Sequence, residues 1–368
     1  MDTVTLVSAG QKYQVPNLGP ALNEQVALVY NSFMTGGVFD ESIFQEKVKS
    51  YFEQHALDHT LHDHYFNAFA QLWLVFLNQG GSLVAEQIWK LALTPVQEWE
   101  KASGQRAHKG TPYYFLGVTA LLSRDIERGF LPMHRSLTED VKTLNQPIPP
   151  TPGNAFVTLD YERQEQFFRP WVLRVAELLE KFLSEYRQKR NHTLTIQEFR
   201  KNFLANPDLR PAAILFVFLL NKMILFNDHV DNGLTQSDFA GLLELDLLFG
   251  FCLVADALIK QKFPNNGANF LRLAAFLLEK AGYGLDETQL GEINRKFLRD
   301  FGKTMPQLSS GQVCGLNLRP SEVDVALCYG IRNRGAHNIE GHEYIFQNFA
   351  EFTQRVLNCL FLAVEVLY

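Results

Sequence analysis

Apolar side chains recur every three or four residues along nearly every segment of this chain that is longer than ten residues. That spacing gathers them on one side of a helix, whereas the alternation at every second residue that strands require is scarce. A chain of 368 residues with 30 phenylalanines can bury a large helical core. The sequence therefore predicts an all-α protein, with an N-terminal hairpin or solenoid-like helical region followed by a C-terminal helical bundle.

A proline-rich segment marks the expected connector between two domains. The sequence QPIPPTPGN, at residues 146–154, holds four prolines and a glycine. Prolines remove backbone donors and disfavour helix. We therefore expect an N-terminal helical region over residues 1–145 and a C-terminal helical domain over residues 155–368.

The segment GTPYYFLGVTALLSRDIERGFLPMHRSLTED precedes the connector and predicts two helices joined at the residues SRD. Gly129 and Ser136 would let these helices approach closely, so residues 110–143 resemble one degenerate tetratricopeptide repeat unit. An ordinary helical hairpin explains the same segment equally well.

Composition and charge exclude several classes of protein. A net charge of -6 argues against a surface coated with positive charge for non-specific nucleic-acid binding. The four cysteines are widely spaced, so neither a disulfide framework nor a zinc site is expected. The most apolar run, PAAILFVFLLNKMILF, is broken by Asn221 and Lys222 before the roughly 18 to 20 residues that a membrane span requires. We expect a cytoplasmic protein with no membrane contact and no cofactor.

Histidines cluster in the sequence HALDHTLHDHYF, which contains His55, His59, His62 and His64. A spacing of four between His55 and His59 would place both on one helix face and suits a zinc or iron site. A second cluster of ligands at a recognisable spacing is missing from the sequence. The prediction is a solvated helix face and no metal site.

A polar segment, RNRGAHN at residues 332–338, separates two expected helices. Ser321 and Asp324 have the spacing of an N-cap and capping box for the first helix. The second is expected to begin near Glu343. Its buried stripe is expected at the following positions: Ile345, Phe349, Phe352, Val356, Leu360, Ala363 and Leu367.

The residue types in this segment suit the cleavage of an RNA phosphodiester without metal. Histidine transfers protons near neutral pH, so His337 is the candidate acid or base. The guanidinium of Arg332 can neutralise the phosphate oxygens, and Asn333 can orient either group or the ribose. One copy supplies a single histidine, so two-sided acid-base chemistry requires a second copy from a symmetric homodimer.

The segment CYGIRNRGAHN resembles the R-x4-6-H signature of the HEPN ribonucleases, in the form in which a polar residue follows the arginine. Residues 237–263 are similar to the long first helix of that family. The resemblance covers about residues 205–368 and implies a four- or five-helix bundle. It also implies a dimer with one composite cleft, metal-independent cleavage of RNA and a 2',3'-cyclic phosphate product. Arg332 and His337 would be the invariant pair of the family, and Asn333 its polar helper.

Two other segments fit the bare pattern, from Arg187 to His192 and from Arg128 to His134. Pro132 interrupts the second of these segments. The first lacks a polar asparagine directly after its arginine and belongs to a basic stretch that would either guide RNA or occupy a solvated helix end.

Partners follow from the resemblance to the HEPN ribonucleases. The expected substrate is single-stranded RNA or a tRNA loop, with Arg334 as a further RNA contact, and the protein would act as a toxin or antiviral effector. A protein partner or antitoxin would bind the N-terminal helical region. Asp246 and Asp256 are expected to pair with Arg332 or Arg334. The alternative function is a non-catalytic scaffold that binds RNA or protein and dimerises through a HEPN-like bundle.

Overall fold

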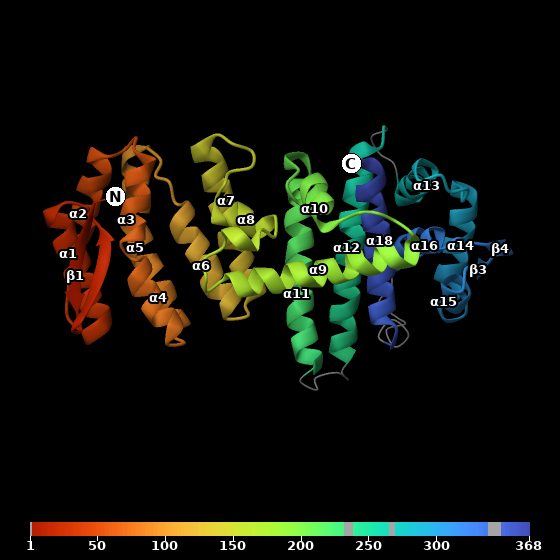
Figure 1. The fold of residues 1–368 in the computed structure, drawn as a ribbon, viewed down its shortest axis with the longest axis horizontal. Coiled ribbons are helices and arrows are strands. Elements are labelled where there is room, and N and C mark those ends of the chain that lie inside the picture. Colours follow the sequence, from red (N-terminus) through yellow and green to blue (C-terminus); the bar gives the residue numbers. More distant parts are fainter. Residues whose placement is uncertain (1, 232–237, 265–268, 338–346) are drawn as a thin grey trace. The chain divides into compact units, whose positions relative to one another are not determined.

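The computed structural model describes residues 2–231, 238–264, 269–337 and 347–368, and of residues 229–231, 238–243 and 335–337 only the backbone. It confirms the all-α class, since 75% of the chain is helical and the described strands form two short hairpins. The chain divides into two compact units, Met1–Ala155 and Phe156–Tyr368 (Figure 1). The expected connector at residues 146–154 ends one residue before this boundary.

The first unit contains a β-hairpin and helices that follow one another along the chain. Its elements are β1 (Thr3–Ser8), β2 (Gln11–Pro16), α1 (Pro20–Thr35), α2 (Glu41–Gln54), α3 (His59–Asn67), α4 (Ala70–Asn78), α5 (Ser82–Ser103), α6 (Gly110–Leu122), α7 (Ile126–Leu144) and α8 (Pro152–Val157), whose last two residues belong to the second unit.

The hairpin of β1 and β2 was not expected from the helical periodicity. Its strands pair antiparallel, with Leu6 opposite Tyr13. Leu6, Tyr13 and Val15 are buried on one face. Ala9 and Gly10 form the two-residue turn of the hairpin. Their φ angles of 51° and 76° are both positive, as in the turn type that two-residue hairpin loops prefer. The signal that could have predicted this hairpin is the alternation of apolar and polar residues in its two short strands.

Helices α6 and α7 form the close hairpin that small residues were expected to allow. A Cβ on Gly117 would lie 2.6 Å from Cγ of Met133, and a Cβ on Gly129 would lie 2.6 Å from Cγ of Leu121. Both glycines therefore set how near the two helices approach. Pro132 lies inside α7 and does not end it, so the expected interruption there was wrong.

Aromatic side chains fill the core of the first unit around α5. The rings of Trp89 and Phe115 stack at 5.2 Å, and Trp73 lies 4.5 Å from Phe115. The indole of Trp73 donates to Thr119 Oγ1 at 2.8 Å, which satisfies its buried N–H. Large aromatic rings thus join α4, α5 and α6.

The second unit contains the longer helices. Its elements are η1 (Tyr161–Arg163), α9 (Arg169–Arg190), α10 (Ile196–Phe199), the π-helical turn η2 (Arg200–Leu204), η3 (Pro207–Leu209), α11 (Arg210–Asp231), α12 (Asp238–Lys262), α13 (Phe270–Lys280), α14 (Glu287–Arg299), α15 (Phe301–Ser309), β3 (Gln312–Val313), β4 (Leu316–Asn317), α16 (Pro320–His337) and α18 (Phe349–Leu367).

Helix α18 is the central helix of the second unit. It packs against α9, α12 and α16, and every residue of the range 352–364 except Arg355 is buried. The expected buried stripe is confirmed at Phe352, Val356, Leu360 and Ala363. The buried surface of α18 is wider than this stripe, because neighbouring helices cover it on several sides. Ile345 lies outside the described residues.

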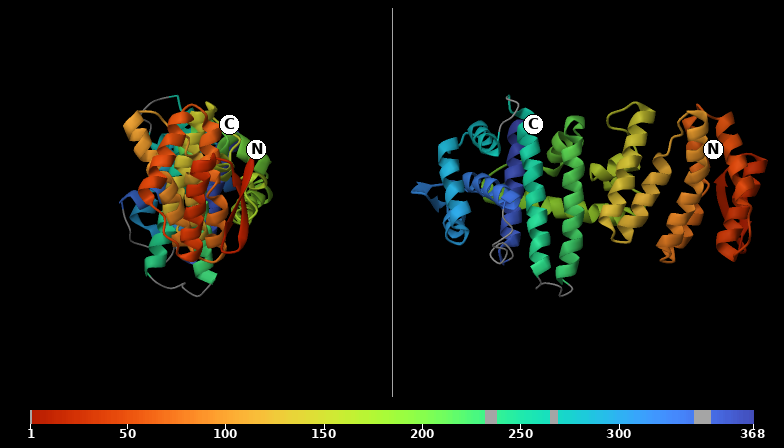
Figure 2. Two further views of the ribbon diagram at one scale, coloured as in Figure 1. Left: turned by 90° about the vertical axis from the view of Figure 1, so that its left-hand side faces the viewer. Right: turned by 180° about the vertical axis from the view of Figure 1, so that it is seen from behind.

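Helices α11, α12 and α18 run side by side (Figure 2). Helix α12 confirms the helix expected over residues 237–263. Gly250 of α12 faces Leu219 of α11, where a Cβ would lie 2.7 Å from the leucine side chain. Among the described helices one, Pro207–Asp228, is long and apolar enough to cross a membrane, and 56% of its apolar 18-residue window is buried inside the protein. It therefore serves as the core helix that the sequence predicted.

Candidate functional site

Helix α16 carries the RNRGAHN segment, and its start differs from the expected capping box. The helix begins at Pro320, so Ser321 lies inside its first turn. The carboxylate of Glu322 instead accepts from the backbone N–H of Arg319 at 2.8 Å. Asp324 is buried and does not cap the helix. The capping prediction was therefore wrong in its residues, because Glu322 takes the role given to Asp324.

Asp324 anchors α16 to two other helices. It accepts from Arg190 of α9 at 2.6 and 3.0 Å, and from Arg355 of α18 at 3.2 Å. Asn358 of α18 donates to its second oxygen at 2.9 Å. This buried carboxylate is compensated on all sides, which makes it a structural clamp. Arg190, expected either to guide RNA or to be solvated, is bound to this clamp.

The rest of the basic stretch is paired as well. Arg187 donates to the backbone carbonyl of Leu194 at 3.1 Å and pairs with Glu180, while Lys189 pairs with Glu185 at 2.6 Å. These contacts hold the end of α9.

Close packing fixes the rotation of α16 about its axis. Cys328 is fully buried beside Cys252 of α12 and Cys359 of α18, and its pKa is raised by the hydrogen bond with Cys252 and, to a smaller extent, by burial. A Cβ on Gly330 would lie 3.1 Å from the ring of Phe297. Arg332 lies one turn after Cys328 on α16, and Asp256 lies one turn after Cys252 on α12, so the two charged side chains meet next to the buried thiols.

Arg332 is the best-defined member of the candidate site. Its Nη2 lies 3.7 Å from Oδ2 of Asp256, and its Nη1 donates to Oδ1 of Asn333 at 3.3 Å. Its guanidinium also lies 5.8 Å from the ring centre of Phe270. The side chain remains 31% exposed. The expected pairing of Asp256 with Arg332 is thus present, whereas Asp246 pairs with Lys222.

Two titratable groups beside Arg332, Asp256 and Tyr329, have raised pKa values. Burial raises the pKa of Asp256, and the charges of Arg332 and Lys260 oppose that rise. Burial likewise raises the pKa of Tyr329, which a hydrogen bond to Asn333 opposes. Asn333 therefore links Arg332 with Tyr329 at this end of the helix.

Arg334 and His337 complete the sequence-predicted site. Arg334 is 7% exposed, and its guanidinium lies 4.4 Å from the ring centre of Phe301. His337 is the last residue of α16, five positions after Arg332. The side chain of His337 and the following Asn338 lie outside the described residues. The structure thus brings together Arg332, Asn333 and Asp256.

The two other R-x-H segments hold different contacts. His192 stacks on Tyr186 at 4.6 Å, and its Nδ1 lies 2.9 Å from Glu365, which fixes the segment after α9 to α18. Arg128 pairs with Glu86 across the first unit, and His134 is exposed on α7. Neither segment combines an exposed arginine end with a neighbouring asparagine.

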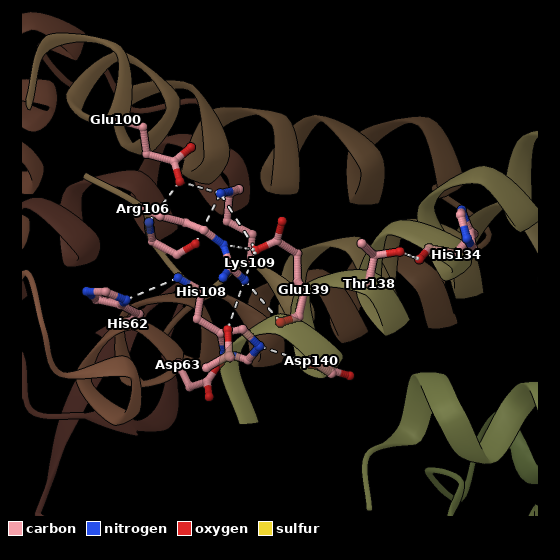
Figure 3. A network of polar contacts seen from close by, with 12 residues as sticks. His62, Asp63, Glu100, Arg106, His108, Lys109, His134, Thr138, Glu139 and Asp140 are labelled. Carbon is pink, nitrogen blue, oxygen red and sulfur yellow. Dashed lines mark hydrogen bonds and ion pairs between the residues drawn. The ribbon is translucent and has the colours of Figure 1, made fainter. Parts of the chain in front are cut away.

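A second polar cluster lies in the first unit, around His108 (Figure 3). Nδ1 of His108 lies 3.0 Å from Oδ1 of Asp63, and Nε2 lies 2.9 Å from Oδ1 of Asp140. The backbone N–H of His108 donates to Nδ1 of His62 at 3.1 Å. Nε2 of His62 faces the carbonyl of His55 at 3.0 Å. Helices α3 and α7 are thereby tied to the segment between α5 and α6.

Further ion pairs extend this cluster. Lys109 pairs with Glu100, and Arg106 donates to Glu139 at 2.9 Å. A Cβ on Gly110 would lie 2.1 Å from Oδ1 of Asp140, so only glycine fits beside the histidine. The segment 106–110 is therefore held by charge and by close packing.

The histidine-rich segment differs from its prediction. His55 follows the end of α2 and His59 begins α3, so the two do not share one helix face. His62 is fully buried and not solvated. In the part of the chain that the structure describes, no three His, Cys, Asp or Glu side chains are arranged to hold a metal ion.

The two histidines of the cluster have opposite pKa shifts. Burial lowers the pKa of His62 to about 4, against weaker effects of its neighbours. Burial alone would lower the pKa of His108 as well, but the hydrogen bonds to Asp140 and Asp63 outweigh it and raise the pKa to about 9. At neutral pH His108 is charged and His62 is neutral.

No protein-family model, curated protein or solved structure matches this chain.

Proposed function

We propose that the chain is a metal-independent endoribonuclease of the HEPN type. The observation that supports it best is Arg332, a partly exposed cation at the end of α16, anchored by Asp256 and Asn333 and followed by His337 on the same helix. An arginine that keeps donors free while one side is anchored is suited to grip a phosphate.

The proposed chemistry uses the 2'-hydroxyl of the RNA as nucleophile. His337 of one motif takes the proton of that hydroxyl, and the oxygen attacks phosphorus. The P–O5' bond breaks, and a second imidazole gives its proton to the leaving oxygen. Arg332 neutralises the charge that develops on the non-bridging oxygens. The products are a 2',3'-cyclic phosphate and a free 5'-hydroxyl.

A homodimer supplies the second imidazole in this proposal. Two copies related by a twofold axis would place their α16 ends at one cleft, so each motif contributes one arginine and one histidine. Mixing Arg332→Ala and His337→Ala chains tests this arrangement. A mixed dimer that regains cleavage above either parent supports a composite cleft, and strict absence of any gain argues for independent sites.

The direct test is cleavage of labelled single-stranded RNA and tRNA in EDTA by the full chain. Arg332→Ala and His337→Ala should each lower the rate by about a hundredfold or more, since proton transfer and charge stabilisation each contribute about that much. The matched controls are Arg128→Ala and His134→Ala, which remove the corresponding residues of another R-x-H segment. Cutting that survives His337→Ala contradicts the proposed site.

The biological role that goes with this activity is that of a toxin or antiviral effector. Expression in a bacterial host should slow growth, and His337→Ala should restore it. Growth inhibition that persists in this variant would point away from RNA cleavage as its cause.

One observation favours the non-catalytic scaffold as the second candidate. The contact between Arg332 and Asp256 joins α16 to α12, which is also what a purely structural ion pair would do. A scaffold would bind RNA or a protein partner without cutting. Its signature is RNA intact under every condition, together with a loss of stability in Arg332→Ala.

A further inference from the structure

A cavity in the second unit lies apart from the residues of the proposed ribonuclease site. It has a volume of about 610 Å³, is open to solvent on one side and is lined by residues of α9, α11 and the first half of α18. Figure 1 shows α9 crossing α11 and α18, and α9 packs against both of these helices. Cavities of this size hold small organic ligands.

Cations line one part of the cavity. Lys181, Lys189, Arg190 and Arg355 all contribute to its walls. The last three are paired with Glu185 or with the Asp324 clamp. Lys181 is exposed and forms no ion pair with the described residues, so its charge remains available to an anionic group of a ligand.

A chain of hydrogen bonds determines which atom of Gln354 needs a partner. The carboxylate of Asp324 accepts from Nδ2 of Asn358, so Oδ1 of Asn358 must accept in turn. Nε2 of Gln354 donates to that Oδ1 at 2.7 Å and to the carbonyl of Phe182 at 3.0 Å. This orientation leaves Oε1 of Gln354 as an acceptor without a partner among the described residues.

Thr353 adds a second unsatisfied oxygen at the same wall. Its Oγ1 has no hydrogen-bond partner among the described residues, and the residue is 2% exposed. Gln354 is 8% exposed. Buried polar atoms without partners cost free energy, so two of them beside one cavity indicate a ligand that supplies hydrogen bonds.

The remaining lining contains the polar residues Glu185, Asn227 and Glu351, of which the two glutamates pair with Lys189 and Arg355, and a group of apolar side chains. Leu178, Phe182, Met223 and Phe349 face the cavity. A fitting ligand therefore combines an anionic group for Lys181, N–H or O–H donors for Gln354 and Thr353, and a flat part for the apolar wall. A nucleotide has all three, since a nucleobase carries donors and stacks on aromatic rings.

We infer that this cavity binds a mononucleotide. The inference goes beyond the proposed RNA cleavage and does not depend on it. Two kinds of molecule carry such a nucleotide: a free nucleoside monophosphate and an RNA strand that places one of its nucleotides in the cavity.

Isothermal titration calorimetry of the full chain with AMP, GMP, CMP and UMP tests the inference. We expect binding of at least one nucleotide, and about tenfold weaker binding in Lys181→Glu because the charge is reversed. Thr353→Val, which keeps the shape and removes the unpaired oxygen, should weaken binding about fivefold without loss of stability. Lys303→Glu, an exposed site on α15, is the matched control and should leave affinity unchanged.

A second arm distinguishes the two sources. A 5'-phosphorylated trinucleotide with 2'-O-methyl groups cannot be cleaved by attack of its own hydroxyl, so its binding is read separately from catalysis. Tighter binding than the mononucleotide assigns the cavity to RNA, and weaker binding assigns it to a free nucleotide. No heat with any nucleotide, equal binding of inorganic phosphate, or full affinity in both Lys181→Glu and Thr353→Val would overturn the inference while leaving RNA cleavage open to its own test.

Discussion

His108 in the first unit and Arg332 in the second are both cations facing carboxylates. They differ in how many of their hydrogen-bond donors are occupied by protein partners. Both ring nitrogens of His108 lie within 3.0 Å of an aspartate, and the residue is 7% exposed. Arg332 meets one carboxylate at 3.7 Å and keeps 31% of its side chain exposed. A cation whose donors are all used stabilises the fold, whereas one with donors left can bind a ligand.

The strongest way to break this comparison is His108→Leu. Removing the imidazole leaves Asp140 buried without its partner, which should cost about 3–5 kcal/mol in the free energy of unfolding. Three of the four tryptophans, Trp73, Trp89 and Trp99, lie in the first unit, so urea unfolding followed by tryptophan fluorescence reports on it. His134→Leu on the exposed face of α7 should change stability by less than about 0.5 kcal/mol. Equal effects of the two substitutions would contradict a stabilising role for His108.

The second prediction concerns pH. Because the pKa of His108 is raised to about 9 from 6.5, its contribution of about 3 kcal/mol is fully present below pH 6.5 and is lost as the pH rises to 9. His62, whose pKa is lowered to about 4, makes the fold less stable as the pH falls from 6.5 towards 4, because only the unfolded chain then takes up a proton. The urea midpoint of the first unit should peak near pH 6.5. His108→Leu should flatten the alkaline side, and an unchanged alkaline decline would disprove the assignment.

A third substitution tests the packing beside the histidine. The methyl group in Gly110→Ala would force Asp140 away from His108, at a cost of about 2 kcal/mol. The control is Gly291→Ala in α14, where the nearest side-chain atom lies 3.7 Å away. That change should stabilise the second unit by about 0.5–1 kcal/mol through helix propensity. Far-ultraviolet circular dichroism during unfolding measures the stability of both variants. Unchanged stability in Gly110→Ala would contradict the close packing of Asp140 against this position.

The smallest expected effect sharpens the other side of the comparison. Asp256→Asn removes the charge that anchors Arg332, and stability should change by less than about 1 kcal/mol because the pair is partly exposed. RNA cleavage should fall about fivefold, since Arg332 is then less well positioned. Asp246→Asn, which removes an exposed aspartate paired with Lys222, should leave cleavage unchanged. If both aspartate variants cut alike, Asp256 does not position the arginine.

The periodicity of apolar residues was enough to predict α12 and most of α18, because a long apolar stripe with three- and four-residue spacing fits a helix and does not fit a strand. The pairing of Asp256 with Arg332 was also predicted, since an acid on an apolar helix needs a nearby cation. The β1–β2 hairpin was missed because its strands have only six residues each and only one buried face. The His108 cluster was missed for another reason: Asp63 and Asp140 lie 45 and 32 residues away along the chain, so no local pattern joins them.

The central position of α18 has a consequence for the order of events during synthesis. This helix follows every other element of the second unit along the chain, yet α9, α12 and α16 all pack on it. A nascent chain that has emerged only as far as Asn348 carries Arg332 and His337 but lacks α18, one of the helices against which α16 packs. The second unit therefore completes its fold only after residues 349–367 have left the ribosome, so the proposed RNA-cutting site is assembled last.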